Sequence, residues 1–125
     1  MSVSRTVPMT VAMWASCFVA VPVHAEPSTK TGAISVAQVV QMLDQAPSNR
    51  MAQQVLTAYL GGVGEAVGVV IDAGGSLCQR PLALTTPEVR AAIAAAAATN
   101  AQANQIAATP LIVRDMLARA GCHRR

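Results

Sequence analysis

Two cysteines, Cys78 and Cys122, limit the folds open to this sequence. Cys78 lies in the segment "GGSLCQRPLALTTPEV", which has the turn residues of a loop, and Cys122 directly follows a glycine that ends an apolar helical pattern. An even number of cysteines in an exported protein is interpreted first as a disulfide. Such a bond would close a loop of about 45 residues and stabilise the domain by roughly 4 kcal/mol in the chain-entropy model.

The N-terminal segment predicts export and removes the third cysteine, Cys17, from the count. Arg5 precedes an apolar run over residues 7–21, and "VPVHA" then ends in a small-residue cleavage site at Ala25. We therefore expect a signal peptide over residues 1–25, cleaved after Ala25, and no membrane span in the mature protein, because the run is too short. The alternative is a lipoprotein signal in which "WASC" ends at a lipidated cysteine. The apolar run continues past that cysteine, which favours the first interpretation.

Catalytic and metal-binding roles for Cys78 are less favoured than a disulfide. A cysteine nucleophile needs a base and an orienting group, and His123 is the only histidine that remains after cleavage. A zinc site usually has four ligands, whereas Cys78, Cys122 and His123 supply three without C-x-x-C spacing. We therefore expect no catalytic residue, no metal ligand and no cofactor.

Composition argues against nucleic acid as a partner. Of nine Lys and Arg residues, eight remain after loss of Arg5, against six Asp and Glu, so the mature net charge is only +2. No Phe or Trp follows the signal peptide, which leaves no aromatic platform on which bases or sugars could stack. Residues 123–125, "HRR", are predicted to be a solvated basic tail. The carboxylates that follow the signal show no pairing at helical spacing for acid–base catalysis: Glu26, Asp44, Glu65, Asp72, Glu88 and Asp115.

The hydrophobic periodicity predicts an all-α fold, a small bundle of about four main helices closed by one disulfide. After a polar entry segment over residues 26–34, the helical domain is expected to span residues 35–122, with an aliphatic core rich in alanine. Capping boxes, in which the first and fourth residues bond each other's backbone, start the first and third helices. The first helix is predicted from Ser35 to before Pro47, and the second from about residue 50 to 71, after a cap at Ser48 or Asn49. The third is predicted from Thr85 to about residue 99, and the last, after a polar connector, from Thr109 to Gly121. The residues of the last helix expected to face the core are Ile112, Val113, Met116, Leu117 and Ala120.

The second helix combines a predicted core stripe with interior glycines. Gly64 and Gly68 lie one turn apart, and we interpret them as a place where a neighbouring helix approaches closely; a kink, a loop, a hinge or a dimer seam are the alternatives. Glu65 between them is predicted to face solvent, the alternative being a buried, hydrogen-bonded carboxylate. The predicted core stripe consists of Met51, Val55, Tyr59 and Val63, widened by Leu56, Leu60 and Val67.

Four motifs in order resemble the Rap1a/Tai family of exported immunity proteins: "YLGGVGEAVG", "LCQRP" in a loop, "TTPEVRAAI" opening a helix, and a last helix that ends in "ARAGC". The resemblance covers about Ser35 to Cys122. It implies a periplasmic, all-helical, often dimeric protein that neutralises a type VI secretion effector, which for the Tai branch is a cell-wall amidase. The chain departs from the family in lacking an earlier cysteine pair and in the alanine-rich end of its third helix.

The leading functional hypothesis is therefore a periplasmic immunity protein that inhibits a secreted effector, acts as a homodimer, and is not an enzyme. The alternative is a periplasmic structural or chaperone-like helical protein without a cognate toxin. A loop held by a rigid scaffold presents side chains to a partner at low entropic cost. We expect partner contacts in the loop 72–81, unless that loop merely connects two helices, with the amide-rich connector 100–105 as the competing candidate. The loop side chains expected to make these contacts are Asp72, Ser76, Gln79 and Arg80.

Overall fold

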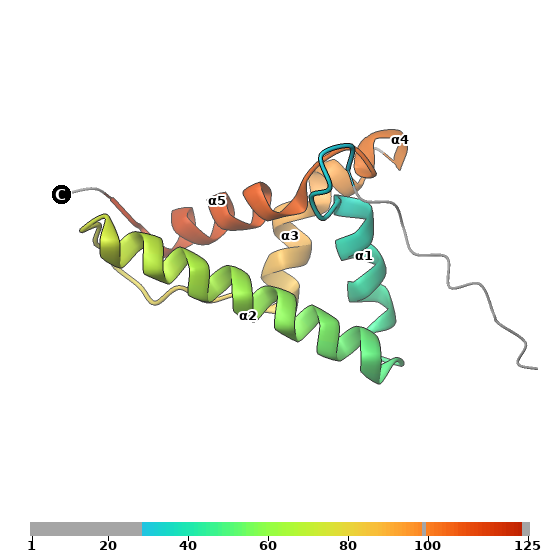
Figure 1. Ribbon diagram of the computed structural model, residues 1–125, viewed down its shortest axis with the longest axis horizontal. Helices are drawn as coiled ribbons and strands as arrows, with labels where there is room; N and C mark the ends of the chain where they lie inside the picture. Colours follow the sequence, from blue (N-terminus) through green and yellow to red (C-terminus); the bar gives the residue numbers. More distant parts are fainter. Residues whose placement is uncertain (1–28, 99, 124–125) are drawn as a thin grey trace, which may run out of the picture.

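The computed structural model of the chain describes residues 29–98 and 100–123 and contains no strand within them (Figure 1). The predicted signal peptide, its cleavage site after Ala25, the start of the entry segment and the last two residues of the tail lie outside this range. The all-α prediction and the single disulfide are confirmed. The helices are α1 (Val36–Gln45), α2 (Arg50–Ala73), α3 (Thr86–Ala97), α4 (Asn100–Ala103) and α5 (Ala108–Ala120).

Side-chain caps fix the starts of the first three helices. The Ser35 hydroxyl accepts a hydrogen bond from the Gln38 amide at 3.1 Å, and the Gln38 side chain accepts one from the Ser35 amide at 2.9 Å. The Asn49 side-chain oxygen accepts two amides in the first turn of α2, at 3.0 and 3.2 Å. The Glu88 carboxylate accepts the Thr85 amide at 2.8 Å. Both predicted capping boxes are present, because each depends only on residues within one turn.

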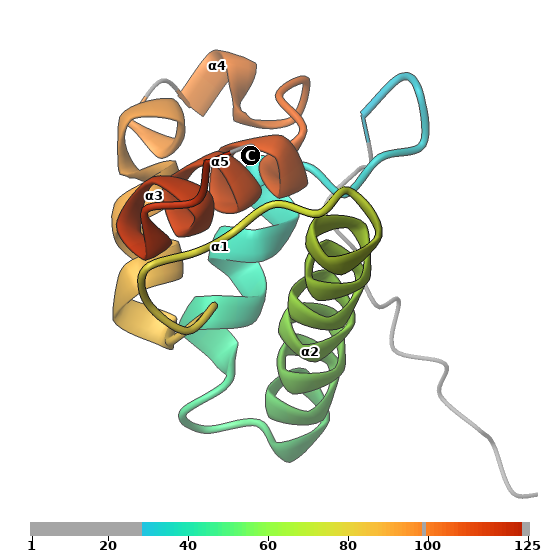
Figure 2. The same ribbon diagram turned by 90° about the vertical axis from the view of Figure 1, so that its left-hand side faces the viewer.

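The core lies where α1, α3 and α5 meet the first half of α2. It consists of aliphatic and alanine side chains. Because these side chains are small, the three short helices pack closely, and this packing fills the space that aromatic side chains would otherwise occupy. Figure 2 shows α2 along one side of the molecule, with α1, α3 and α5 grouped beside it. The buried cluster comprises Val36, Val39, Leu43, Leu56, Val89, Ile93, Ala103, Ala108 and Ile112.

The buried face of α2 differs from the predicted stripe. Only Ala52 and Leu56 are buried on this 24-residue helix. Met51 and Val55 were predicted to face the core, but the structure leaves them 67% and 48% exposed, so that part of the prediction is wrong. Successive helical residues are about 100° apart, and the neighbouring helices contact α2 around Leu56, one position beyond Val55. The other predicted positions Tyr59, Leu60, Val63 and Val67 are half-buried.

The predicted close approach at the glycines of α2 is also wrong. A Cβ built on Gly64 or on Gly68 would meet nothing within 4 Å, so no neighbouring helix requires glycine there. The helix continues through both positions, which equally excludes a loop. Glu65 is exposed, as predicted. The second half of α2 thus extends along α5 with much of its surface uncovered (Figure 1).

Backbone pairing joins the entry segment to the connector before α5. The Val36 amide donates to the Ile106 carbonyl, and the Ala108 amide donates to the Ile34 carbonyl, each at 2.9 Å. The connector contains the four-residue helix α4, and α5 starts at Ala108, close to the predicted Thr109. The Thr109 hydroxyl is hydrogen-bonded to the Tyr59 hydroxyl at 2.9 Å and so ties α5 to the middle of α2.

Candidate partner-binding surface

The loop predicted to contact a partner begins later than expected. Helix α2 continues to Ala73, so Asp72 lies exposed on its last turn and not in the loop. Gly75 adopts a left-handed conformation with φ +62°, and at this residue the chain turns out of the helix and into the loop. The half-buried Ser76 donates its amide to the Ile71 carbonyl at 3.1 Å. The predicted contact residues therefore lie on two different elements.

The disulfide between Cys78 and Cys122 fastens this loop to the end of α5, as predicted. The residues next to the cysteines add a short antiparallel bridge. The Leu77 amide donates to the His123 carbonyl at 3.1 Å, and the His123 amide donates to the Leu77 carbonyl at 3.0 Å. Leu77 itself is 46% exposed. An apolar side chain is thus displayed on a backbone that covalent and hydrogen bonds hold in place.

The side chains of Gln79 and Arg80 have different surroundings. Their amides both donate to the Ala120 carbonyl, at 2.9 and 3.0 Å, at the end of α5. Gly121 there is left-handed with φ +63°, and the Gln79 side chain packs against it so closely that a Cβ would lie 3.2 Å from its oxygen. Arg80 is exposed and has no ion pair among the described residues. Arg80 is therefore the freer of the two to contact a partner, while Gln79 covers the helix end.

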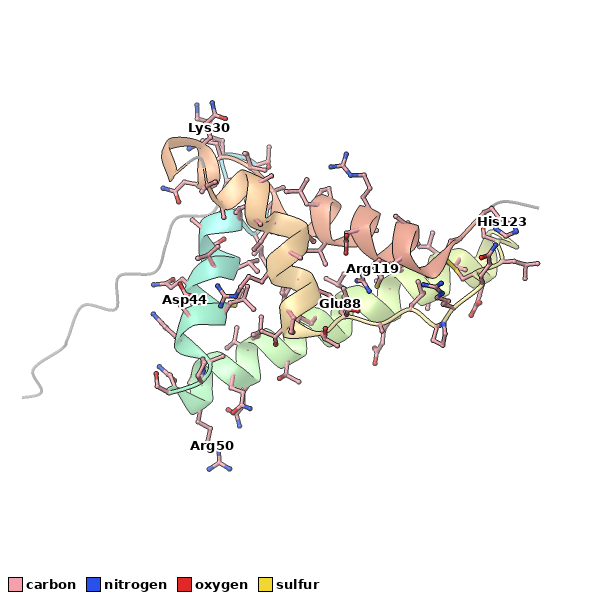
Figure 3. The ribbon with its side chains drawn as sticks, turned by 180° about the vertical axis from the view of Figure 1, so that it is seen from behind. Lys30, Asp44, Arg50, Glu88, Arg119 and His123 are labelled. Carbon is pink, nitrogen blue, oxygen red and sulfur yellow. A yellow bond between two sulfur atoms is a disulfide. The ribbon has the colours of Figure 1, made fainter. Side chains whose placement is uncertain are left out.

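Arg119 holds the second half of the loop in place, a role that the sequence analysis missed. Its guanidinium contacts the Glu88 carboxylate at 2.7 Å and the Asp115 carboxylate at 2.8 Å, and it donates to the Ala83 carbonyl at 3.3 Å (Figure 3). Hydrogen bonds from the backbone and hydroxyl of Thr85, followed by the charge of Arg119, hold the pKa of Glu88 below its usual value. Only the Asp115–Arg119 pair, four residues apart on one helix, could have been read from spacing.

An apolar groove of about 300 Å³ runs between α2 and α5 beside this loop. A smaller hollow of about 190 Å³, lined in part by Ser76 and Cys122, shares Ile71 and Leu117 with it and extends it to the disulfide. Val113 and Leu117 were predicted to face the core, but they are half-buried and line this groove, because α2 does not close over them. The groove is lined by Ala66, Val67, Val70, Ile71, Val113 and Leu117.

The competing candidate, the connector 100–105, lies at the opposite end of the molecule from the loop (Figure 1). Asn104 is half-buried there beside a hollow of about 420 Å³, and its side-chain oxygen has no hydrogen-bond partner among the described residues. The side chain of Asn100 lies outside the described part of the chain. The two candidates are therefore separate surfaces that can be tested independently.

Three further features bear on what the described residues can do. They contain no group of three or more His, Cys, Asp or Glu side chains arranged to hold a metal ion. A hollow of about 630 Å³ lies between the α1–α2 turn and the start of α3 and has apolar, threonine and glutamine side chains in its wall. Within the same residues, α2 alone is long and apolar enough to cross a membrane, judged by length and composition only, and little of it is buried.

These features describe an all-α, disulfide-bonded domain that displays a fixed loop and several uncovered apolar surfaces. No protein-family model matches the chain, and neither does any curated protein or solved structure. The assignment to a family of exported inhibitors accordingly remains a proposal based on the motifs.

Proposed function

We propose that this protein is a periplasmic immunity protein that binds and inhibits a type VI secretion effector with peptidoglycan amidase activity. The observation that carries the proposal is the order of the four motifs, together with the bond between the cysteines of "LCQRP" and "ARAGC". In the Rap1a/Tai family that this order resembles, the second motif is a loop cysteine followed by proline and the fourth is a closing helix that ends in a cysteine. A disulfide fits the oxidising compartment to which the predicted signal peptide directs the chain.

The loop with residues 74–81 is the inhibitory element in this proposal. Its backbone is bonded at Cys78 and hydrogen-bonded on both sides of it, so binding would restrict few additional backbone torsions. Leu77 supplies an exposed apolar anchor, and Arg80 supplies a charge able to form two hydrogen bonds with a carboxylate. The α2–α5 groove lies beside the loop and can receive an apolar segment of the effector.

The test uses the purified protein and a candidate effector, a secreted peptidoglycan amidase that is sought first among the genes neighbouring its own. Peptidoglycan hydrolysis is followed by loss of turbidity while this protein is titrated in, and affinity is measured by calorimetry. We expect stoichiometric inhibition with a Kd below about 1 µM. Full hydrolysis at a twofold excess of this protein, together with no heat of binding, would reject the enzyme as its partner and the immunity function with it.

Matched variants then locate the contact. Leu77→Ala combined with Arg80→Ala should weaken binding by about tenfold or more, because both side chains project from the fixed loop. Arg114→Ala is the control, since Arg114 is also exposed and has no ion pair among the described residues. Asn104→Ala tests the competing connector. Loss of binding in the Asn104 variant with an unaffected loop variant would move the inhibitory site to the other end of the molecule.

A further inference from the structure

The hollow of about 630 Å³ lies between the first half of α2, the turn that precedes this helix and the start of α3. Figure 2 shows these segments in the lower half of the molecule. The loop 74–81 follows the other end of α2, a helix about 36 Å long, so the hollow is separate from the proposed inhibitory surface. Sites for small ligands have volumes of roughly 300–1,000 Å³ and combine apolar walls with a few polar groups.

The wall of this hollow is apolar, and its rim is polar but uncharged. The rim has Gln53 and Thr57, one turn apart on α2, and Thr85 and Thr86 at the start of α3, all of them exposed. No Asp, Glu, Lys, Arg or His is among the described residues that line it. An uncharged ligand suits such a site, because a charge taken out of water needs a partner. The apolar wall is formed largely by Leu43, Leu56, Leu60 and Leu84.

The polar groups of the rim are available to a ligand. The side chains of Gln53, Thr57 and Thr86 make no hydrogen bond within the described part of the chain, and each can both donate and accept. The Thr85 hydroxyl donates to the Glu88 carboxylate at 2.9 Å and so retains only acceptor capacity. The rim therefore matches a ligand that carries donors and acceptors side by side, as a chain of amide groups does.

We propose that this hollow binds a short, extended and uncharged peptide that carries a branched aliphatic side chain. The aliphatic side chain enters between the leucines, and the peptide amides form hydrogen bonds with the rim. Gln53 and Gly61 mark a length of about 12 Å along α2, which an extended chain covers with about four residues. A Cβ on Gly61 would meet nothing within 4 Å, so a peptide backbone has room to approach α2 there.

Other classes of ligand fit these residues less well. A fatty acyl chain forms no hydrogen bond with the rim along its length. A sugar ring would find no aromatic side chain among the described residues of the wall. An anion would find no cation there and would approach the Glu88 carboxylate, which holds the amide of Thr85 at 2.8 Å and already has Arg119 as its ion-pair partner. A neutral peptide satisfies both the leucines and the rim.

The test titrates the purified protein with the capped tetrapeptide acetyl-Ala-Leu-Ala-Ala-amide and follows heteronuclear NMR spectra. We expect saturable shifts at residues that line the hollow, with a Kd below about 1 mM. Aspartate in place of the leucine of the peptide should weaken binding by about tenfold or more. An absence of shifts at about 5 mM peptide would overturn the proposal. Equal affinity for 3-methylbutan-1-ol, which carries the aliphatic group without amides, would also overturn it.

Matched variants locate the site. Gly61→Leu should weaken peptide binding by about tenfold or more, because its side chain occupies the hollow. Gly62→Leu is the control, a neighbouring glycine with equally open space that does not line the hollow. Leucine favours helix over glycine, so neither change should disturb folding. Gln53→Met should weaken binding by about fivefold through loss of hydrogen bonds, whereas Gln54→Met, beside it but off the hollow, should not. Equal effects within either pair would contradict the proposed site.

Two further measurements define the ligand and its independence from effector binding. A twelve-residue uncharged peptide with the same four residues at its centre should bind as tightly as the tetrapeptide if the ligand is part of a longer chain. Binding weakened by about tenfold or more would instead assign the site to free short peptides. The combined Leu77→Ala and Arg80→Ala variant should bind the tetrapeptide as the wild type does. Peptide binding and inhibition of an effector can therefore fail separately, and a loss of peptide binding in this loop variant would refute a site in the hollow.

Discussion

Removal of the disulfide should destabilise this domain strongly. The perturbation is the pair Cys78→Ser and Cys122→Ser, made together so that no free thiol remains. The bond joins residues 44 positions apart. In the chain-entropy model a loop of this size lowers the entropy of the unfolded chain by about 13 cal/mol/K, which is about 4 kcal/mol at 25 °C. Small domains have a total stability of about 5–15 kcal/mol, so the loss is a large part of the whole.

The contacts around the bond allow this effect to be separated from loss of local structure. Leu77 and His123 exchange two backbone hydrogen bonds, and the Ala120 carbonyl accepts two more, none of which requires the sulfurs. The folded state of the double variant should therefore keep its helix content. Since the change acts on the unfolded chain, the unfolded variant should also be more expanded, and the dependence of its unfolding free energy on urea should become steeper.

The assay is urea unfolding followed by circular dichroism, with both proteins at one concentration so that self-association contributes equally. Wild-type protein in reductant is the control, and it should match the double variant. A decrease in the unfolding free energy of less than about 1 kcal/mol, with equal steepness, would refute the entropic reasoning. A decrease in the variant that reductant does not reproduce would show that the serine substitutions themselves, and not the lost bond, cause the change.

Three further predictions concern single residues. Gly68→Ala should raise the unfolding free energy by about 1 kcal/mol in urea titration, because alanine favours helix and its methyl group meets no neighbour. A lower unfolding free energy would instead indicate that a neighbouring helix packs closely against Gly68, as the sequence predicted. Tyr59→Phe should lower it by about 1 kcal/mol, and a double-mutant cycle with Thr109→Val should show that the two changes are coupled rather than additive. Glu88→Gln should destabilise at pH 7, because the lowered pKa of Glu88 stabilises the fold above its ordinary pKa of about 4.3. This contribution is lost as pH falls through the folded pKa, so the difference in unfolding free energy between variant and wild type should shrink progressively in acid titration.

Features decided by neighbouring residues were predictable from the sequence. The capping boxes at Ser35 and Thr85 depend on side chains three positions away, and the stop at Gly121 depends on one left-handed glycine. The disulfide was predictable for a different reason, because once Cys17 is assigned to a signal peptide only one pairing remains. In each case few competing arrangements exist.

The surface features could not be predicted because they depend on which neighbours cover a face. Helix α2 has apolar residues on both its core side, at Leu56 and Val67, and its outer side, at Val55 and Val69, so periodicity alone does not show which side is buried. The contact of Arg119 with Glu88 joins two helices and has no signature in spacing. The partner-binding residues remain predictions, with Asp72 moved from the loop to the helix.

The bond between Cys78 and Cys122 also turns part of the chain into a closed covalent ring that contains α3, α4 and α5. One cut by a protease anywhere within this ring opens it without releasing a fragment, because the sulfurs still join the two pieces. A cut in α1 or α2 lies outside the ring and divides the molecule, apart from noncovalent contacts. Loops inside the ring, including the exposed segment at Arg80, can therefore be nicked while the cut ends stay attached to one another.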